Sequence, residues 1–256
     1  MTTHEDALAE FATLFPARPD PDGMSLGATD PDFLALYRDF AFGETLGHVD
    51  LDRRERLLYQ LAASIAVGAA SEFRALLGAA LEVGVRPIEV KEVTYQAVAY
   101  VGSARAIEFI VLSNEVFTAH GIALPLEGQS TTTPETRRDT GLAVQTEIFG
   151  AGVVDGLFSG PADARQFSEF LAGNCFGDYY TRSGLDLRQR ELITFALLAA
   201  LGGADLQVKS HVTANLAVGN TRADLLAVLT VLVALIGYPR TLNALAQVNA
   251  AAPASD

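Results

Sequence analysis

The sequence predicts an all-α protein made of two copies of one helical unit. Apolar residues recur at helical spacing through most of the chain, and no stretch alternates apolar and polar residues between turn dipeptides as hairpin strands do. A long internal repeat is the second observation. The third is that aspartate and glycine stand at the expected helix ends, where they cap and terminate helices.

The repeat aligns LDRRERLLYQLAASIAVGAA, from Leu51, with LDLRQRELITFALLAALGGA, from Leu185, at a separation of 134 positions. One inserted residue raises the separation to 135, and the match then continues to Arg105 and Arg240. A repeat of this length indicates a duplicated structural unit rather than a solenoid module. The predicted organisation is a first repeat over residues 1–124, a linker over 125–137 and a second repeat over 138–256.

Each half shows the same order of elements. A helix and a loop precede a helix that Asp52 or Asp186 opens as N-cap, and Gly68 or Gly202 ends that helix. Two or three further helices follow, and Pro87 fits the first turn of one of them. The segment GNCFGDYY, from Gly173, is expected to be a loop, and PLEGQSTTTPETR reads as the linker because turn residues replace the apolar period.

Two corresponding helices differ in polarity. The stretch from Leu225 to Ile236 is apolar on all sides, which predicts an enclosed core helix. Its counterpart, IEVKEVTYQAVAYV, carries Glu89, Glu92 and Gln96 on one face. The simpler interpretation is that this face is exposed to solvent, and the alternative is that it lines a pocket between the halves.

Composition excludes several classes of protein. The 256 residues are 50% hydrophobic, enough for a sizeable core, and the net charge of −13 with no basic stripe disfavours nucleic acid as a partner. The longest apolar run, from Leu225, is shorter than the roughly 18 residues that a membrane span requires. Because Cys175 is the only cysteine and the amino end lacks a secretory pattern, we expect a cytoplasmic protein without disulfides or membrane attachment.

One predicted helix carries a polar row that could form a site. In LQVKSHVTANLAVGN the residues Gln207, His211 and Asn215 are four apart, so they lie on one face among small apolar side chains. Neutral polar groups in such a setting are typical of a half-buried pocket wall. The alternative is that His211 only hydrogen-bonds a backbone carbonyl in the core or at a subunit contact.

The second half, from RELITFALLAALGGADLQVKSHVTANLAVGN to the turn GYPR, resembles the carboxymuconolactone decarboxylase family, and the first half resembles a diverged copy. The resemblance implies the all-helical alkylhydroperoxidase D-like fold. It also implies a homo-oligomer, with a trimer of duplicated chains forming a pseudo-hexameric ring. One branch of this family decarboxylates a carboxylated lactone without a cofactor.

The other branch of the family uses a CxxC pair before the motif histidine. Here the positions seven and four residues before His211 are Ala204 and Gln207, so the redox pair is absent. Cys175 has no partner thiol, and a lone cysteine of this kind is typically a small buried apolar residue. A peroxiredoxin-like activity is therefore disfavoured.

The resemblance also suggests roles for individual residues. His211 falls on the motif histidine as general acid or base. Glu191 falls on the upstream glutamate that orients it or relays its proton, and the alternative is that Glu191 faces solvent, as charged residues in such a stretch usually do. Arg190 and Arg240 match family arginines and would bind a substrate carboxylate or lactone oxygen, with Gln207 and Asn215 as further substrate-binding groups. The alternative for the two arginines is a structural role, in helix-terminal salt bridges with Asp186 or Glu191. Leu76 stands at the histidine position of the first copy, so one site per chain is expected.

Taken together, these patterns predict a cofactor-independent decarboxylase acting on a small carboxylated or lactone-like organic acid. An isomerase or cyclase on a natural-product intermediate is one alternative, and a non-catalytic ligand-binding or assembly protein is another. The four histidines show no metal-binding spacing, so no metal site is expected. Tyr179 and Tyr180, at the end of the expected loop, and Arg182 just after it could close over a pocket, although loop tyrosines more often pack on a helix end.

Overall fold

The computed structural model describes residues 4–15 and 26–254, and every regular element within these ranges is helical. The all-α prediction is therefore confirmed. The first half contains α1 (His4–Leu14), α2 (Leu26–Thr29), α3 (Pro31–Arg38), the π-helix η1 (Asp39–Glu44), the 3₁₀ turn η2 (Leu46–His48), α4 (Arg53–Val67), α5 (Ala70–Glu82), α6 (Pro87–Val101) and α7 (Ser103–Ala119).

The second half repeats this order after the linker. It contains α8 (Arg137–Phe149), α9 (Ala151–Phe158), the 3₁₀ turn η3 (Ala162–Ala164), α10 (Arg165–Phe170), the π-helix η4 (Leu171–Tyr180), α11 (Leu187–Leu201), α12 (Asp205–Ala217), α13 (Arg222–Ile236) and α14 (Tyr238–Ala251). Among the described residues, no helix has the length and apolar character needed to cross a membrane.

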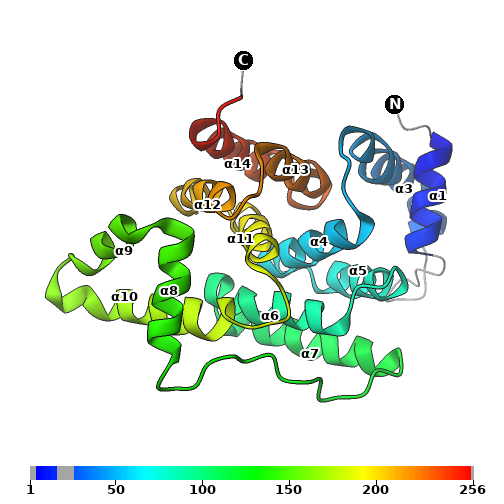
Figure 1. Cartoon of the computed structure of the whole chain (residues 1–256). Coiled ribbons are helices and arrows are strands. Elements are labelled where there is room, and N and C mark those ends of the chain that lie inside the picture. The colour runs from blue at the N-terminus through cyan, green and yellow to red at the C-terminus, as the bar shows by residue number, and fades with distance from the viewer. Residues whose placement is uncertain (1–3, 16–25, 255–256) are drawn as a thin grey trace.

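The two matched helices of the repeat, α4 and α11, pack against each other at the centre of the molecule (Figure 1). Each begins where the sequence predicted. The side chain of Asp52 accepts a hydrogen bond from the backbone nitrogen of Arg54 at 3.0 Å, and that of Asp186 accepts one from Gln189 at 2.8 Å. Gly68 ends α4 in the left-handed conformation, with φ of 75°, which glycine adopts without strain.

Around this central pair, the three helices that follow α4 and the three that follow α11 lie on opposite sides. In Figure 1, α12, α13 and α14 lie on one side of α11, while α5, α6 and α7 lie on the other side of α4. The helices α8 to α10 form a lobe that projects from this body. The duplication extends upstream of each π-helix, because α1 packs on η1 as α8 packs on η4.

The segment GNCFGDYY is helical, so its assignment as a loop was wrong. It lies within η4, which packs along α8. The approach is close, because a Cβ added to Gly177 would lie 2.0 Å from the backbone oxygen of Arg137, and one added to Gly141 would lie 2.0 Å from that of Ala172. Gly177, one of the glycines that suggested a loop, instead permits this contact between helix backbones together with Gly141 of α8.

On the face of α6 that carries Glu89, Glu92 and Gln96, the last two are buried against the second half and Glu89 is buried beside Arg54 and Arg86, so the solvent-exposed interpretation was wrong. Glu92 is 1% exposed and Gln96 is fully buried. The amide of Gln96 donates to the backbone oxygen of Arg190 and to Thr194 Oγ1, both at 2.9 Å. These polar groups find partners on α11, which local sequence periodicity does not reveal.

The helix α13 is less enclosed than its apolar sequence predicted. Leu225, Val228 and Leu232 are buried in the core. On another face, Leu226 and Thr230 line a groove with a volume of about 290 Å³. Complete enclosure of this helix was therefore an incorrect expectation.

Candidate active site

The histidine of α12 is bonded to a carboxylate of α11. His211 Nδ1 lies 2.7 Å from Glu191 Oε2. Glu191 is fully buried, and 9% of His211 is exposed. A carboxylate accepts a hydrogen bond from Nδ1–H, which leaves Nε2 as the nitrogen that can exchange a proton with another molecule. The second oxygen of the carboxyl group, Glu191 Oε1, is buried without a hydrogen-bond partner among the described residues.

Two asparagines hold this pair in place. Asn215 is fully buried, and its Nδ2 donates to the backbone oxygens of His211, at 2.7 Å, and Glu191, at 3.1 Å. Its Oδ1 accepts a bond of 2.9 Å from Asn220, which follows α12. Asn220 also donates to the backbone oxygen of Arg188, at 2.9 Å. These bonds join α11 to α12 and fix the separation of the Glu191 and His211 backbones.

Aromatic rings flank the imidazole of His211 on two sides. The ring centroid of Phe149, from α8, lies 5.4 Å away at an interplanar angle of 86°. That of Tyr100, from α6, lies 6.2 Å away at 77°. Edge-on packing of this kind limits the orientations of the imidazole. Because α6 belongs to the first half, that half supplies one wall of the site.

A cluster of three hydroxyl groups lies behind this aromatic wall. The Tyr100 and Tyr180 oxygens are 2.8 Å apart, Tyr180 lies 2.5 Å from Thr194 Oγ1, and Thr194 donates to Tyr100 at 3.0 Å. Burial raises the pKa of Tyr100 and of Tyr180 well above the usual value of 10.0. Both phenols therefore keep their protons near neutral pH and act as neutral hydrogen-bonding groups.

The lone cysteine lies near this cluster and is buried, as predicted. Burial raises the pKa of the Cys175 thiol to about 12. Because the thiolate is the form that attacks a peroxide, a thiol held in this state is unreactive near neutral pH. The structure thus adds a physical reason to disfavour peroxidase chemistry.

Arg190 is fully buried in a separate set of contacts. Its NH2 lies 2.9 Å from Glu92 Oε2 and donates to the backbone oxygen of Arg182 at 2.7 Å, while NH1 donates to Gln96 at 3.0 Å. Its carboxylate partner is therefore Glu92, not Asp186 or Glu191 as one interpretation expected. Like Asn215, Arg190 directs its hydrogen bonds to protein groups.

The remaining predicted residues lie at the surface. Gln207 is exposed in the first turn of α12, one turn before His211. Arg240 is exposed at the start of α14, where its side chain lies beside Gly202. The structure thus brings His211, Glu191 and Asn215 together and leaves Gln207 and Arg240 outside this cluster.

Three contributors to the site were missed in the sequence: Tyr100, Phe149 and Thr194. Tyr100 follows Gln96 by four residues, so its position on the same polar face was a usable signal. His211 lines neither the groove on α13 nor the cavity that Lys91, Tyr95 and Arg182 help to line. Within residues 4–15 and 26–254, no group of three histidine, cysteine or acidic residues could hold a metal ion.

Comparison with known proteins agrees with the duplicated fold. The sequence model of the carboxymuconolactone decarboxylase family matches two regions, residues 31–110 and 165–250. A curated relative, the 4-carboxymuconolactone decarboxylase of Acinetobacter baylyi, is 34% identical over 92 residues, which is 36% of this chain and 68% of that protein.

Proposed function

Because the chain belongs to the carboxymuconolactone decarboxylase family, we propose that it is a carboxy-lyase acting on a small carboxylated or lactone-like organic acid. The observation that carries this proposal is the bond between His211 Nδ1 and the buried carboxylate of Glu191. A buried carboxylate that orients an imidazole is a recurrent arrangement for proton transfer, because it sets which ring nitrogen faces the substrate.

In the proposed reaction, the bond between the substrate carbon and its carboxylate breaks and CO2 leaves. The electron pair moves into a conjugated carbonyl and forms an enolate, and His211 Nε2 then donates its proton to the carbon. A proton from solvent restores His211. Glu191 stabilises the positive charge that the imidazole carries before this transfer. No cofactor takes part in the proposed reaction.

The surrounding residues have supporting roles in this proposal. Asn215 and Arg190 act as positioning residues, since both are fully buried and bonded to protein groups. Gln207 and Arg240 are the candidate substrate-binding groups, since both are exposed. Phe149 and Tyr100 restrict water around the imidazole, which strengthens the electrostatic interactions there.

The test is to incubate the purified protein with a panel of carboxylated lactones and to follow CO2 release and substrate loss together. Equal molar amounts of both are expected, and they should fall with His211→Gln, which keeps a polar side chain of similar size. Substrate loss without CO2 would contradict decarboxylation and support the isomerase or cyclase alternative. No turnover of any compound in the panel would count against the proposal as stated.

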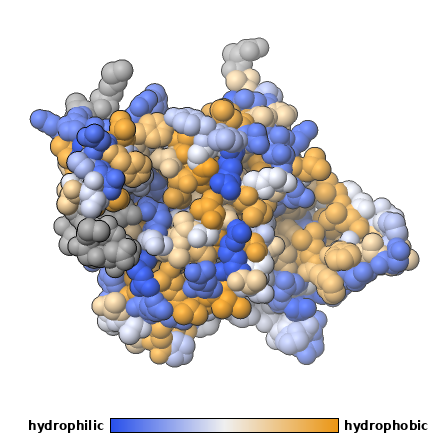
Figure 2. Space-filling model, turned by 180° about the vertical axis from the view of Figure 1, so that it is seen from behind, coloured by the Kyte–Doolittle hydropathy of each residue, from blue (hydrophilic) through white to orange (hydrophobic). Residues whose placement is uncertain are grey.

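We also propose that the chain forms a homo-oligomer, with a trimer as the expected state. Large apolar side chains are exposed on the lobe of α9 and α10, where Val153 is 55%, Phe167 68% and Phe170 61% exposed. Figure 2 shows hydrophobic residues gathered over this projecting lobe. Large apolar side chains that are exposed next to one another are typical of interaction surfaces. A monomer in light scattering at micromolar concentration would contradict the proposal, and Phe167→Asp should weaken the assembly.

A further inference from the structure

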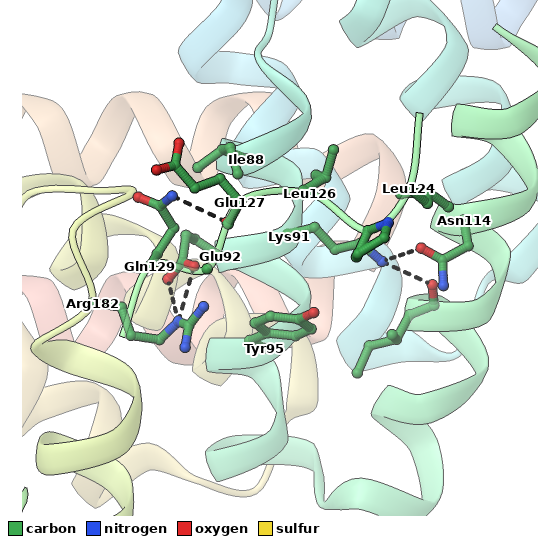
Figure 3. Close-up of a pocket in the computed structure, with 13 residues that line it drawn as sticks. Ile88, Lys91, Glu92, Tyr95, Asn114, Leu124, Leu126, Glu127, Gln129 and Arg182 are labelled. Carbon is green, nitrogen blue, oxygen red and sulfur yellow. Dashed lines mark hydrogen bonds and ion pairs between the residues drawn. The ribbon is translucent and has the colours of Figure 1, made fainter. Parts of the chain in front are cut away.

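A cavity of about 340 Å³ lies away from His211, between α6, α7, the linker and the loop that follows η4 (Figure 3). This volume is within the range of small-molecule sites. The lining shares no residue with the contacts of His211, Glu191 and Asn215. Its walls include Lys91, Glu92 and Tyr95 from α6, Asn114 from α7, and Arg182 from the loop.

Buried cations outnumber buried carboxylates at the inner wall of this cavity, where Lys91 and Arg182 line the cavity and Arg190 lies behind Glu92. Glu92 Oε1 lies 2.9 Å from Arg182 Nε, and Glu92 Oε2 lies 2.9 Å from Arg190 NH2, so two arginines share one carboxylate. Lys91 is 6% exposed and has no carboxylate partner among the described residues. In a chain whose net charge is −13, a buried excess of cations is an uncommon feature that an anion would neutralise.

The hydrogen bonds of Lys91 explain how its charge is held. Nζ donates to Asn114 Oδ1 at 2.6 Å, to Ser113 Oγ at 2.9 Å and to the backbone oxygen of Ile110 at 3.2 Å. All three acceptors are neutral, so they satisfy the donors without cancelling the charge. The ammonium also lies 5.9 Å from the centre of the Tyr95 ring.

Several donors in the cavity are unused. No hydrogen bond from described residues reaches the terminal nitrogens of Arg182, the Nδ2 of Asn114 or the Tyr95 hydroxyl. The Arg182 guanidinium lies over the Tyr95 ring at 5.1 Å. Figure 3 shows Tyr95 between Arg182 on one side and Lys91 with Asn114 on the other. Glu127 contributes an exposed carboxylate at the rim.

The rest of the lining is apolar, which indicates the kind of molecule that would fit. Ile88, Ile110, Leu124 and Leu126 face the cavity together with the Tyr95 ring. A carboxylate can bind the free edge of a guanidinium through two parallel hydrogen bonds, while an apolar body packs on the aromatic ring. A fully polar anion such as phosphate would leave these apolar walls unused.

The duplication provides an internal comparison for this cavity. Leu226, Thr230 and Leu245 stand at the positions that correspond to Lys91, Tyr95 and Ile110, and they line the groove of about 290 Å³ on α13 and α14. That groove is thus the counterpart of the cavity, with leucine in place of lysine. The corresponding pair of helices thus forms in the second half without a lysine or a tyrosine at these positions.

We propose that the cavity binds a small organic acid, with its carboxylate on the terminal nitrogens of Arg182 and its apolar or aromatic body on Tyr95. This site is additional to the proposed active site. It requires no chemical step, and its ligand would be held by the charge excess and the apolar wall together.

The test is isothermal titration calorimetry of the full chain with benzoate and with benzamide, which has the same shape without the charge. Saturable benzoate binding is expected, with benzamide at least about tenfold weaker, the usual scale for a charged hydrogen bond. Arg182→Gln should weaken benzoate binding by about 10- to 100-fold, while Arg74→Gln, a surface arginine outside the cavity, should not change it.

Two further variants keep the result interpretable. Leu126→Trp fills the cavity without altering a charge and should abolish binding even if Arg182→Gln proves poorly folded. His211→Gln should bind benzoate as the wild type does. The proposal is overturned if benzoate shows no saturable binding to the wild type. It is also overturned if both Arg182→Gln and Leu126→Trp still bind benzoate as the wild type does. Binding lost only in His211→Gln places the acid at the candidate active site and also overturns it, without contradicting the decarboxylase proposal.

Discussion

The two central helix pairs, α4 with α5 and α11 with α12, have the same fold and different interiors. At the positions of Glu191 and His211, the first half carries Leu57 and Leu76, which are 0% and 3% exposed. Two leucines therefore fill the space that an ionisable pair fills in the other half. Because a buried polar pair rarely stabilises a core more than apolar residues of similar size, the pair is best explained by a function.

A second comparison concerns an arginine that both halves retain. Arg56 and Arg190 stand at corresponding positions and are 5% and 0% exposed. Arg190 pairs with Glu92 on α6, whereas Arg56 pairs with Glu10 on α1. The buried guanidinium is therefore common to the two halves, and each half recruits its carboxylate from a different helix. This suggests a structural role for both arginines.

The largest expected effect is a loss of turnover when the histidine of the second half is replaced. Replacing His211 by alanine should lower turnover by roughly 10²- to 10⁴-fold, the usual scale for loss of a general acid or base, and α12 should stay folded. Steady-state CO2 release measures this effect.

The matched change in the first half is Leu76→His in the His211→Ala background. It should restore no activity, because Leu57, Glu72 and Ala80 still replace Glu191, Gln207 and Asn215. Recovery of turnover would show that the halves are interchangeable and would contradict the assignment of one site per chain. Full activity in His211→Ala alone would move the search to Glu89, Glu92 and Gln96.

The next effect concerns the two arginines. Arg190→Met should lower the free energy of unfolding by about 3 kcal/mol, because it removes one partner of a buried ion pair. Arg56→Met should cost only about 1 kcal/mol, because Glu10 keeps its partly exposed partner Arg53. Urea unfolding measures both losses, provided that the free energy of unfolding depends on urea concentration with the same slope in each variant. Equal losses would show that the two arginines are equivalent in their surroundings.

A smaller effect tests the difference between Lys91 and its counterpart Leu226. Burial lowers the pKa of Lys91 from 10.5 to about 8, so the folded state holds this proton less tightly than the unfolded state does. Below pH 8 both states are protonated, and the folded state carries the full cost of a buried charge. Between about pH 8 and 10.5 the folded state releases the proton first, and stability rises with pH.

The variant Lys91→Leu removes this dependence. It should be more stable than the wild type at pH 7, and its advantage should shrink as the pH rises from 8 to 10.5. Because Tyr100 and Cys175 titrate alike in both proteins, the difference between the two unfolding curves isolates Lys91. Curves that run parallel over this range would contradict the lowered pKa.

The smallest expected effect is on the thiol. Cys175→Ser should leave turnover within about twofold of the wild type, because a buried thiol with a raised pKa takes no part in the proposed proton transfer. Measured CO2 release is again the readout, with thermal unfolding to detect any packing loss. A variant that is folded and inactive would revive the peroxiredoxin-like interpretation.

Local signals predicted much of the fold and part of the site. Helical periodicity, the caps at Asp52 and Asp186 and the left-handed Gly68 depend on neighbours within a few residues, so a single sequence reveals them. The resemblance to a known family then pointed to His211 and Glu191, which the structure brings within hydrogen-bond distance. In contrast, the loop predicted for GNCFGDYY was wrong, because Gly177 permits a close contact with α8.

The sequence by itself determined the all-helical class, the duplication and the polar row on α12. The class and the row follow from spacings of three and four residues, and the duplication follows from the alignment of the two halves. Only the tertiary structure decided which groups meet across the halves. Gln96 bonds Thr194 and Glu92 bonds Arg190, each across 98 positions of the chain. Such contacts depend on how α6 packs on α11, and a buried polar face has the same periodicity in the sequence as an exposed one. The packing of α6 on α11 therefore buries a face that was expected to be exposed to solvent, and Glu92 and Gln96 on this face connect the two halves.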